Sequence, residues 1–264
     1  AYPPNDADDA EIWGAVEAAL TTHEPRIMAW LDRAPQTNEV ARSGILLTAL
    51  WWILSQTGAR PVALSELGAS AGLNLSLDRF AIATPQGPAG ESQSNVQLRP
   101  EWRAPPPQAQ PLEIVERGGV DQHPVDVRNP EDALRLLSYI WPDQPARMAM
   151  SRGAIALCQG PPDQGDAAPW LEARLAARAQ NQLHVVYSTV AWQYFPPETQ
   201  TRCTHALEQA GLSATPDTPL AHVAFEADGR RDGAALTIRI WPHAPEPNVV
   251  ARGDFHGRWI HWNC

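Results

Sequence analysis

The stretch Glu66-Leu67-Gly68-Ala69-Ser70-Ala71-Gly72-Leu73-Asn74 decides the predicted fold. It begins at the end of a short apolar run, residues 62–67, that is typical of a buried strand, and it leads into a helix start. A Gly-x-x-x-Gly spacing after a strand lets the backbone pass close to a nucleoside, and it leaves the Glu66 carboxylate free to meet a cationic group. The stretch therefore predicts a strand, loop and helix unit that holds a nucleoside cofactor.

The same stretch resembles motif I of the S-adenosylmethionine-dependent methyltransferases, and its place after a strand adds to the resemblance. The resemblance implies S-adenosylmethionine as the cofactor and a methyltransferase acting on an acceptor that the sequence does not identify. It assigns the cofactor contacts of the loop to Glu66, Gly68, Ala69, Ser70, Gly72 and Asn74.

A serine hydrolase is the main alternative, because Gly68-x-Ser70-x-Gly72 is also the pattern of a nucleophile elbow. Ser70, then Asp166 or Asp217, then His256 follow the chain order of the hydrolase triad. Against this hypothesis, no His-Gly-Gly segment lies upstream for an oxyanion hole. Only helices are predicted before the strand, whereas hydrolase elbows normally follow several strands.

Three further interpretations of the loop stay open. A dinucleotide oxidoreductase would have glycine where this chain has Ser70, so it ranks behind the hydrolase. A non-catalytic module that binds an adenosyl group would show the same loop as a methyltransferase. Two glycines can also form a tight turn that binds nothing.

The rest of the chain predicts an α/β fold. Residues 1–60 are helical by pattern, with a cap at Asp8 and Asp9 and a buried helix over 39–57 that ends at Gly58. Strands and helices alternate from residue 61, which predicts a doubly wound, mostly parallel sheet, as in the Rossmann-like methyltransferase fold. We expect an irregular excursion over 84–111, with a hairpin around 95–98.

The final strands are predicted at 221–226, 234–241 and 255–262, separated by turns, and they give the sheet a C-terminal antiparallel hairpin. In this organisation the N-terminal helical segment, residues 1–60, packs on the core. Residues 61–264 form the Rossmann-like domain.

Further cofactor contacts are predicted at the ends of the later strands, where ligands of such sheets bind. Asp121 is placed to bind the ribose, although it lies further from the glycines than the usual ~20 residues, and it could equally be a turn residue. Asp166 stands in a Gly-Asp-Ala that resembles the adenine-contacting turn of many methyltransferases, and it is also a natural helix N-cap. Ser188 ends the next strand.

Trp192, Tyr194 and His256 are the candidate catalytic residues. The two aromatic residues follow a strand at the edge where an acceptor would bind, although core packing is their commoner role. His256 could act as a general base near neutral pH, or it could be structural. His256 and His261 fall on opposite faces of the predicted strand, so we predict no metal site.

Composition sets the remaining expectations. With 264 residues, 44% of them hydrophobic and 19% charged, the chain can form one large packed domain, and its net charge of -10 argues against nucleic acid as a partner. Three widely spaced cysteines fit neither a disulfide framework nor a zinc site, which indicates the cytoplasm. The most apolar run, residues 45–54, is too short to span a bilayer, so we expect no membrane partner.

With these features in place, the chain is identified as similar over its whole length to a bacterial family known as domain of unknown function 2332. The family implies a methyltransferase-like fold and no established activity. Members typically carry a further N-terminal helical stretch, and this chain begins at Ala1 with neither Met nor a signal-like segment, so we expect a shortened or processed product. The resemblance is carried by Pro35 to Glu39, Glu66 to Asn74, Asp78 to Phe80, Trp141 to Gln144, Ser188 to Tyr194, Pro219-Leu220 and His256 to Trp259.

The segment Pro35-Gln36-Thr37-Asn38-Glu39 gathers polar groups directly before the predicted buried helix. We expect it to line the cofactor site. The alternative is a helix cap formed by Thr37 or Asn38.

Overall fold

The computed structural model describes residues 5–32, 35–58 and 60–263. Within these residues, nine strands form one sheet in the order β5-β12-β11-β10-β9-β8-β1-β6-β7. Pairing is parallel from β7 through β6, β1 and β8 to β9, and antiparallel from β9 through β10 and β11 to β12. In chain order the strands are β1 (Val62–Leu67), β5 (Glu101–Trp102), β6 (Ile114–Asp121), β7 (Asp163–Gln164), β8 (Leu183–Thr189), β9 (Leu220–Glu226), β10 (Ala234–Trp241), β11 (Ala244–Gly253) and β12 (Trp259–Trp262).

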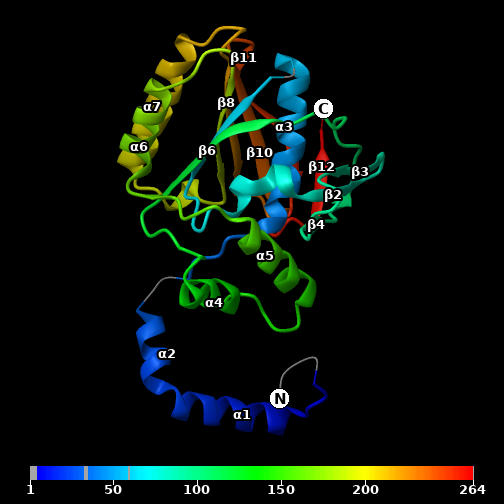
Figure 1. Ribbon diagram of the computed structural model, residues 1–264, viewed down its shortest axis with the longest axis vertical. Helices are drawn as coiled ribbons and strands as arrows, with labels where there is room; N and C mark the ends of the chain where they lie inside the picture. Colours follow the sequence, from blue (N-terminus) through cyan, green and yellow to red (C-terminus); the bar gives the residue numbers. More distant parts are fainter. Residues whose placement is uncertain (1–4, 33–34, 59, 264) are drawn as a thin grey trace.

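Helices cover both faces of this sheet (Figure 1). The α-helices are α1 (Asp9–Thr22), α2 (Glu24–Leu31), α3 (Ser43–Thr57), α4 (Pro130–Ser138), α5 (Pro145–Leu157), α6 (Ala167–Ala176) and α7 (Pro197–Leu212). The 3-10 helices are η1 (Val40–Arg42), η2 (Leu73–Arg79) and η3 (Trp192–Tyr194). A separate small sheet has the order β3-β2-β4, with β2 (Ala81–Thr84), β3 (Gly87–Gly90) and β4 (Gln97–Leu98).

The alternation of side chains along β1 divides the core into two layers. Val62 and Leu64 pack in a cluster with the apolar residues of α3, whereas Leu67 packs in a second cluster with α6 and α7. Because successive strand residues point to opposite faces, a strand with helices against both faces has no exposed side, so even the polar residues Ser65 and Glu66 of β1 are buried. All six residues of β1 are buried for this reason.

The large, mostly parallel sheet predicted from the sequence is confirmed. The predicted buried helix over 39–57 is also present, as η1 followed by α3, and it ends at Gly58, whose φ of 82° suits a residue without a side chain. The C-terminal antiparallel part is larger than predicted, because β11 lies between β10 and β12. The sequence does not predict β11 because it contains Pro245 and Pro247, and proline is disfavoured inside strands. The pairing of β11 with β10 is also irregular.

Two local expectations differ from the structure. The glycine loop leads into the short 3-10 helix η2, with a kink at Ser76, instead of an α-helix. The hairpin expected around 95–98 lies earlier in the chain, between β2 and β3, and Gln97–Leu98 pairs with β2 in parallel. Proline and glycine are frequent in this segment, and they obscure the alternation that marks a strand.

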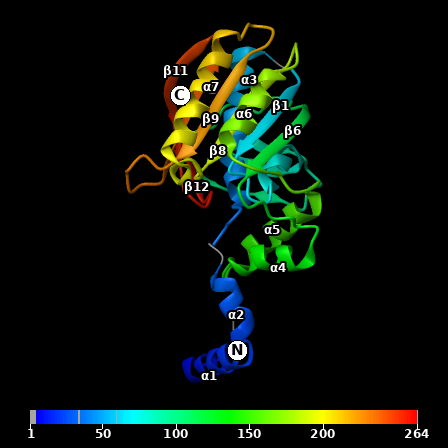
Figure 2. The ribbon, with the colours of Figure 1, turned by 90° about the vertical axis from the view of Figure 1, so that its left-hand side faces the viewer.

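The N-terminal segment was expected to pack on the core, and its two halves behave differently. α3 is almost wholly buried against the sheet. By contrast α1 and α2 contain no buried residue, and they extend from the rest of the molecule beyond α4 (Figure 2). The predicted cap of α1 is present, because the Asp8 side chain accepts a hydrogen bond from the backbone of Glu11 and the Glu11 side chain accepts one from Asp8.

Candidate functional site

A cavity of about 800 Å³ opens at the carboxyl ends of the parallel strands. Its walls come from the loop after β1, the end of β6, the turn between β7 and α6, and the loop after β8. Strands β6 and β7 lie on one side of β1 in the sheet. Strands β8 and β9, which come later in the chain, lie on its other side. The cavity therefore lies at the point where the strand order reverses, which is where open α/β sheets bind ligands.

Most backbone N–H groups of the glycine loop are already hydrogen-bonded within the protein. Gly68 and Ala69 both donate to the Val120 carbonyl, at 2.9 and 3.0 Å between N and O. The Ser70 N–H donates to the Asp121 carboxylate at 2.8 Å, and Leu73 donates to the Asn38 side chain at 2.9 Å. The loop is thus fixed by its neighbours, and these N–H groups do not form an anion cradle of the kind that binds phosphates.

Close packing explains three of the glycines. A side chain on Gly119 would stand 2.8 Å from the Ala69 Cβ, and one on Gly68 would stand 2.6 Å from the Ala191 Cβ. Gly72 has a φ of 71°, and a side chain there would press on Leu75 and Pro162. Of the two motif glycines, Gly68 lines the cavity, whereas Gly72 shapes the turn behind it.

The segment before α3 lines the cavity, with Pro35, Gln36, Thr37 and Asn38 in its wall. The Gln36 amide donates to the Asp121 carboxylate, at 3.2 Å. Asn38 does not cap α3; its side chain accepts from Leu73 and so caps η2. This segment therefore ties the N-terminal part of the chain to the glycine loop.

Arg42 is a cavity residue that the sequence analysis missed. Its side chain is buried, and its Nε and Nη1 donate to the carbonyls of Phe255 and Thr189 at 2.8 and 2.9 Å. Burial lowers the pKa of Arg42, against the opposing effect of Glu39, Glu226 and Glu66. The guanidinium thus joins the end of β8 to the turn before β12.

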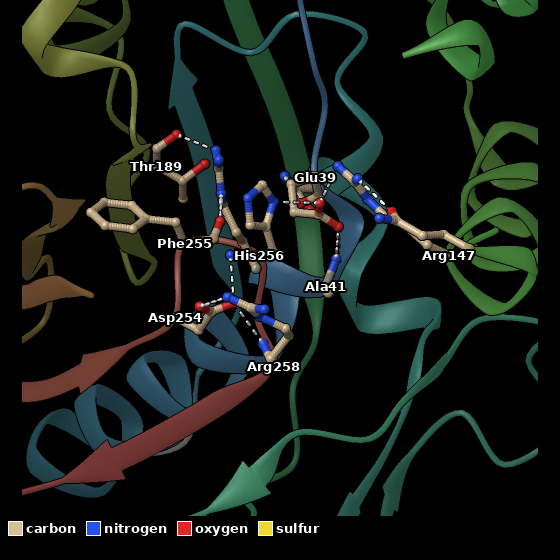
Figure 3. Close-up of polar contacts among 11 residues, drawn as sticks. Glu39, Ala41, Arg147, Thr189, Asp254, Phe255, His256 and Arg258 are labelled. Atoms are coloured by element: carbon tan, nitrogen blue, oxygen red, sulfur yellow. Dashed lines mark hydrogen bonds and ion pairs between the residues drawn. The ribbon is translucent and has the colours of Figure 1, made fainter. Parts of the chain in front are cut away.

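Glu39 is the centre of a polar cluster (Figure 3), and its charge also acts on Arg42. Arg147 of α5 and His256 approach its carboxylate from opposite sides, at 2.6 Å and 3.3 Å. Arg258 forms an ion pair with Asp254 in the same turn, at 2.7 Å. His256 therefore contacts Glu39, and it is not among the residues that line the cavity.

Glu66 is buried at the end of β1 on the same face as α3. Its Oε2 has no hydrogen-bond partner among the described residues. Burial raises its pKa to about 8, against the opposing effect of Tyr187, Arg42 and Asn74. The carboxyl group is therefore protonated near neutral pH, and Glu66 is not among the residues that line the cavity.

Of the other residues predicted to bind the cofactor, some line the cavity and others do not. Ser70 and Asp121 line the cavity, and the buried Ser70 Oγ has no partner among the described residues. Asp166 caps α6 through Ala168, at 2.8 Å, and accepts from Thr199 at 2.9 Å, so both of its oxygens are used. Ala69, Asn74 and Ser188 are buried and are not part of the cavity wall.

The three candidate catalytic residues are not brought together. Tyr194 lines the cavity and is 76% exposed. Trp192 packs against Phe195 and His222 instead. His256 lies in the Glu39 cluster. Other polar residues of the wall were missed, namely His123, Arg135 and Tyr139. The sequence could have indicated them only by their position, shortly after Asp121 or in and directly after the next helix, α4.

The hydrolase arrangement is not assembled in this structure. The Ser70 Oγ has no base within hydrogen-bond distance among the residues described, and the proposed base, His256, is bound to Glu39. Ser70 does adopt a left-handed conformation, with a φ of 55°, as a nucleophile elbow would. A strained loop residue is common at ligand sites of many kinds, so the conformation alone does not identify a nucleophile.

No cluster of three or more His, Cys, Asp or Glu side chains that could hold a metal ion occurs in the described part of the chain. Within the same residues, no helix combines the length and apolar character needed to cross a membrane.

Comparisons with known proteins give one match. No curated protein and no solved structure matches this chain. A family model described as "Uncharacterized protein conserved in bacteria (DUF2332)" matches residues 1–262. Because this match spans nearly the whole sequence, the chain belongs to the bacterial DUF2332 family.

Proposed function

We propose that this chain binds S-adenosylmethionine in the cavity at the carboxyl ends of β1, β6 and β8, and that it transfers the methyl group to a small acceptor. The position of the cavity supports the proposal, since it lies where the strand order reverses and Gly68, Ser70 and Asp121 form part of its wall. Its volume of about 800 Å³ falls within the range of small-molecule sites.

The proposal rests mainly on one observation, namely that N–H groups of the glycine loop already donate hydrogen bonds to the protein itself. Those of Gly68, Ala69 and Ser70 are all bound by the protein, so the loop has few donors left for a pyrophosphate. A nucleotide with phosphates needs such donors. An adenosyl group attached to an amino acid does not, and this favours S-adenosylmethionine over a dinucleotide.

The residues present fit such a ligand. Gly165 and Ala167, in the turn after β7, would lie against the adenine, and Asp121 and Gln122 would bind the ribose. Asp121 has three protein donors already, so its carboxylate is held in a fixed position for further contacts. The methionyl part would pass over Gly68 and Ser70, where the Ser70 Oγ is a buried polar atom still without a partner.

The bound sulfonium would supply an activated methyl group, so the protein has mainly to align the acceptor and exclude water. His123, Tyr139 and Tyr194 line the cavity and are the polar groups placed to orient an acceptor. The backbone N–H of His123 donates to Asp121 at 2.9 Å, which fixes the main chain at this position. Because His123 lines the cavity and His256 does not, we propose His123 as the group that receives the acceptor's proton.

A thermal-shift panel tests the proposal. S-Adenosylmethionine and S-adenosylhomocysteine should raise the melting temperature, because a ligand that binds only the folded state stabilises it by mass action. NAD and ATP should leave the melting temperature unchanged. Stabilisation by NAD or ATP, with no effect of either adenosyl compound, would reject the proposal.

A further inference from the structure

Arg42 carries a charge that the described residues do not neutralise directly. It is 9% exposed and lines the cavity, yet it forms no ion pair among these residues. Its two hydrogen bonds to carbonyls use Nε and one hydrogen of Nη1. The guanidinium therefore retains donors, on Nη2 and Nη1, at the wall of the cavity.

The three carboxyl groups near Arg42 are committed elsewhere. Glu39 forms its ion pair with Arg147, at 2.6 Å, and also contacts His256. Glu226 accepts hydrogen bonds from the backbone of Ala191 and Trp192, at 3.2 and 3.3 Å. Glu66 is held protonated near neutral pH by its burial. None of them supplies Arg42 with the paired carboxylate that a buried guanidinium normally has.

A buried charge without a partner is costly, and buried arginines are generally paired. The planar guanidinium presents its donors as a fork that matches a carboxylate. Arg42 stands by the end of β8, beside Thr189, and Gly68 and Ser70 of the glycine loop line the same cavity. A ligand lying over the glycine loop and carrying a carboxylate would complete this arrangement.

We propose that Arg42 binds the α-carboxylate of the methionyl group of S-adenosylmethionine. This inference rests on the function proposed above and specifies how the amino-acid end of the cofactor is recognised. It follows that the site selects adenosyl compounds with an amino-acid head over those without one.

The test compares two ligands on the intact protein by titration calorimetry. S-Adenosylhomocysteine carries the carboxylate, whereas 5'-methylthioadenosine has the same adenosyl thioether and lacks the amino acid. Wild-type protein should bind S-adenosylhomocysteine at least about tenfold more tightly, as expected for a charge-assisted hydrogen bond. In Arg42→Gln this preference should fall to within about twofold. Arg128→Gln is the matched control, because Arg128 pairs with Asp126 and does not line the cavity, and it should keep the preference.

Each outcome decides a separate point. Equal binding of both ligands by the wild type overturns the role of Arg42 and leaves the adenosyl site standing. Binding of neither ligand overturns the proposed function itself. A folded Arg42→Gln variant that keeps the full preference also overturns the inference. If that variant does not fold, because Arg42 joins Thr189 to Phe255, then Arg42→Lys replaces it; that variant keeps the charge without the fork and should lose part of the preference.

Discussion

The backbone N–H of Ser70 donates a hydrogen bond to the Oδ2 of Asp121, 2.8 Å away. This bond joins the loop after β1 to the end of the neighbouring strand β6. The other oxygen of Asp121 accepts from His123 and from the Gln36 side chain. One carboxylate therefore connects three segments of the cavity wall.

Replacing Asp121 by alanine should lower both stability and cofactor affinity. The variant loses three hydrogen bonds and leaves the Ser70 N–H without its partner, which should cost about 1–3 kcal/mol of unfolding free energy. Chemical denaturation and titration with S-adenosylhomocysteine measure the two effects. Asp126→Ala is the control, since Asp126 is paired with Arg128 and does not line the cavity, and it should bind normally. Normal binding by Asp121→Ala would place the ligand elsewhere.

Glu66→Gln should stabilise the ligand-free protein at alkaline pH. Burial raises the pKa of Glu66 from 4.5 to about 8, so the folded state keeps a proton that the unfolded state loses. The stabilising effect of that proton is complete below pH 4.5 and is lost as the pH rises through 8. Relative to Glu66→Gln, the unfolding free energy of the wild type should therefore decrease by about 1.4 kcal/mol for each pH unit across this window.

Denaturation curves at pH 5, 7 and 9 measure this difference. Glu17→Gln, at an exposed position on α1, is the control for the substitution itself. A pH-independent difference for Glu66→Gln would show that Glu66 does not titrate in this window.

Ser70→Ala should keep cofactor affinity within about threefold of the wild type, since the Ser70 Oγ is only one of several polar contacts with a bound ligand. A fluorophosphonate probe should leave the wild type unlabelled, because the Ser70 Oγ has no base among the described residues. Mass spectrometry of the probe-treated protein makes the measurement. Stoichiometric labelling at Ser70, absent in Ser70→Ala, would establish the hydrolase instead of the methyltransferase.

Asp166→Ala should destabilise the fold without weakening cofactor binding. Asp166 caps α6 and accepts a hydrogen bond from Thr199, and these two roles are together worth about 1–2 kcal/mol. Its oxygens do not line the cavity. Thermal melting and calorimetry separate the effects. A loss of affinity beyond about fivefold in a folded protein would instead support the adenine contact that its Gly-Asp-Ala context suggests.

Local patterns in the sequence were sufficient for the parallel sheet and the glycine loop. The apolar runs at β1 and β8 and the glycines at 68 and 72 carry their signal within a few residues. β11 was missed because Pro245 and Pro247 disrupt the pattern of a strand.

The candidate site was only partly predictable, because its key contacts join residues far apart in the chain. Arg42 reaches the Thr189 carbonyl across 147 positions, and Glu39 meets His256 across 217. Neither pairing leaves a periodic signal. Asp121 could be named because it ends a strand, whereas nothing in the sequence distinguished Arg42 from the other arginines.

Titration calorimetry of S-adenosylhomocysteine with three forms of the protein tests the central claim most directly. A side chain on Gly165 would meet only the Val120 Cγ2, at 4.0 Å, so Gly165→Leu should fill the cavity and leave the fold intact. Gly14→Leu is the matched control, because Gly14 faces open space on α1. We predict saturable binding of one ligand per chain to the wild type and to Gly14→Leu, and at least about tenfold weaker binding to Gly165→Leu. No binding to the wild type, or equal binding to all three forms, would contradict the claim that this cavity is an S-adenosylmethionine site.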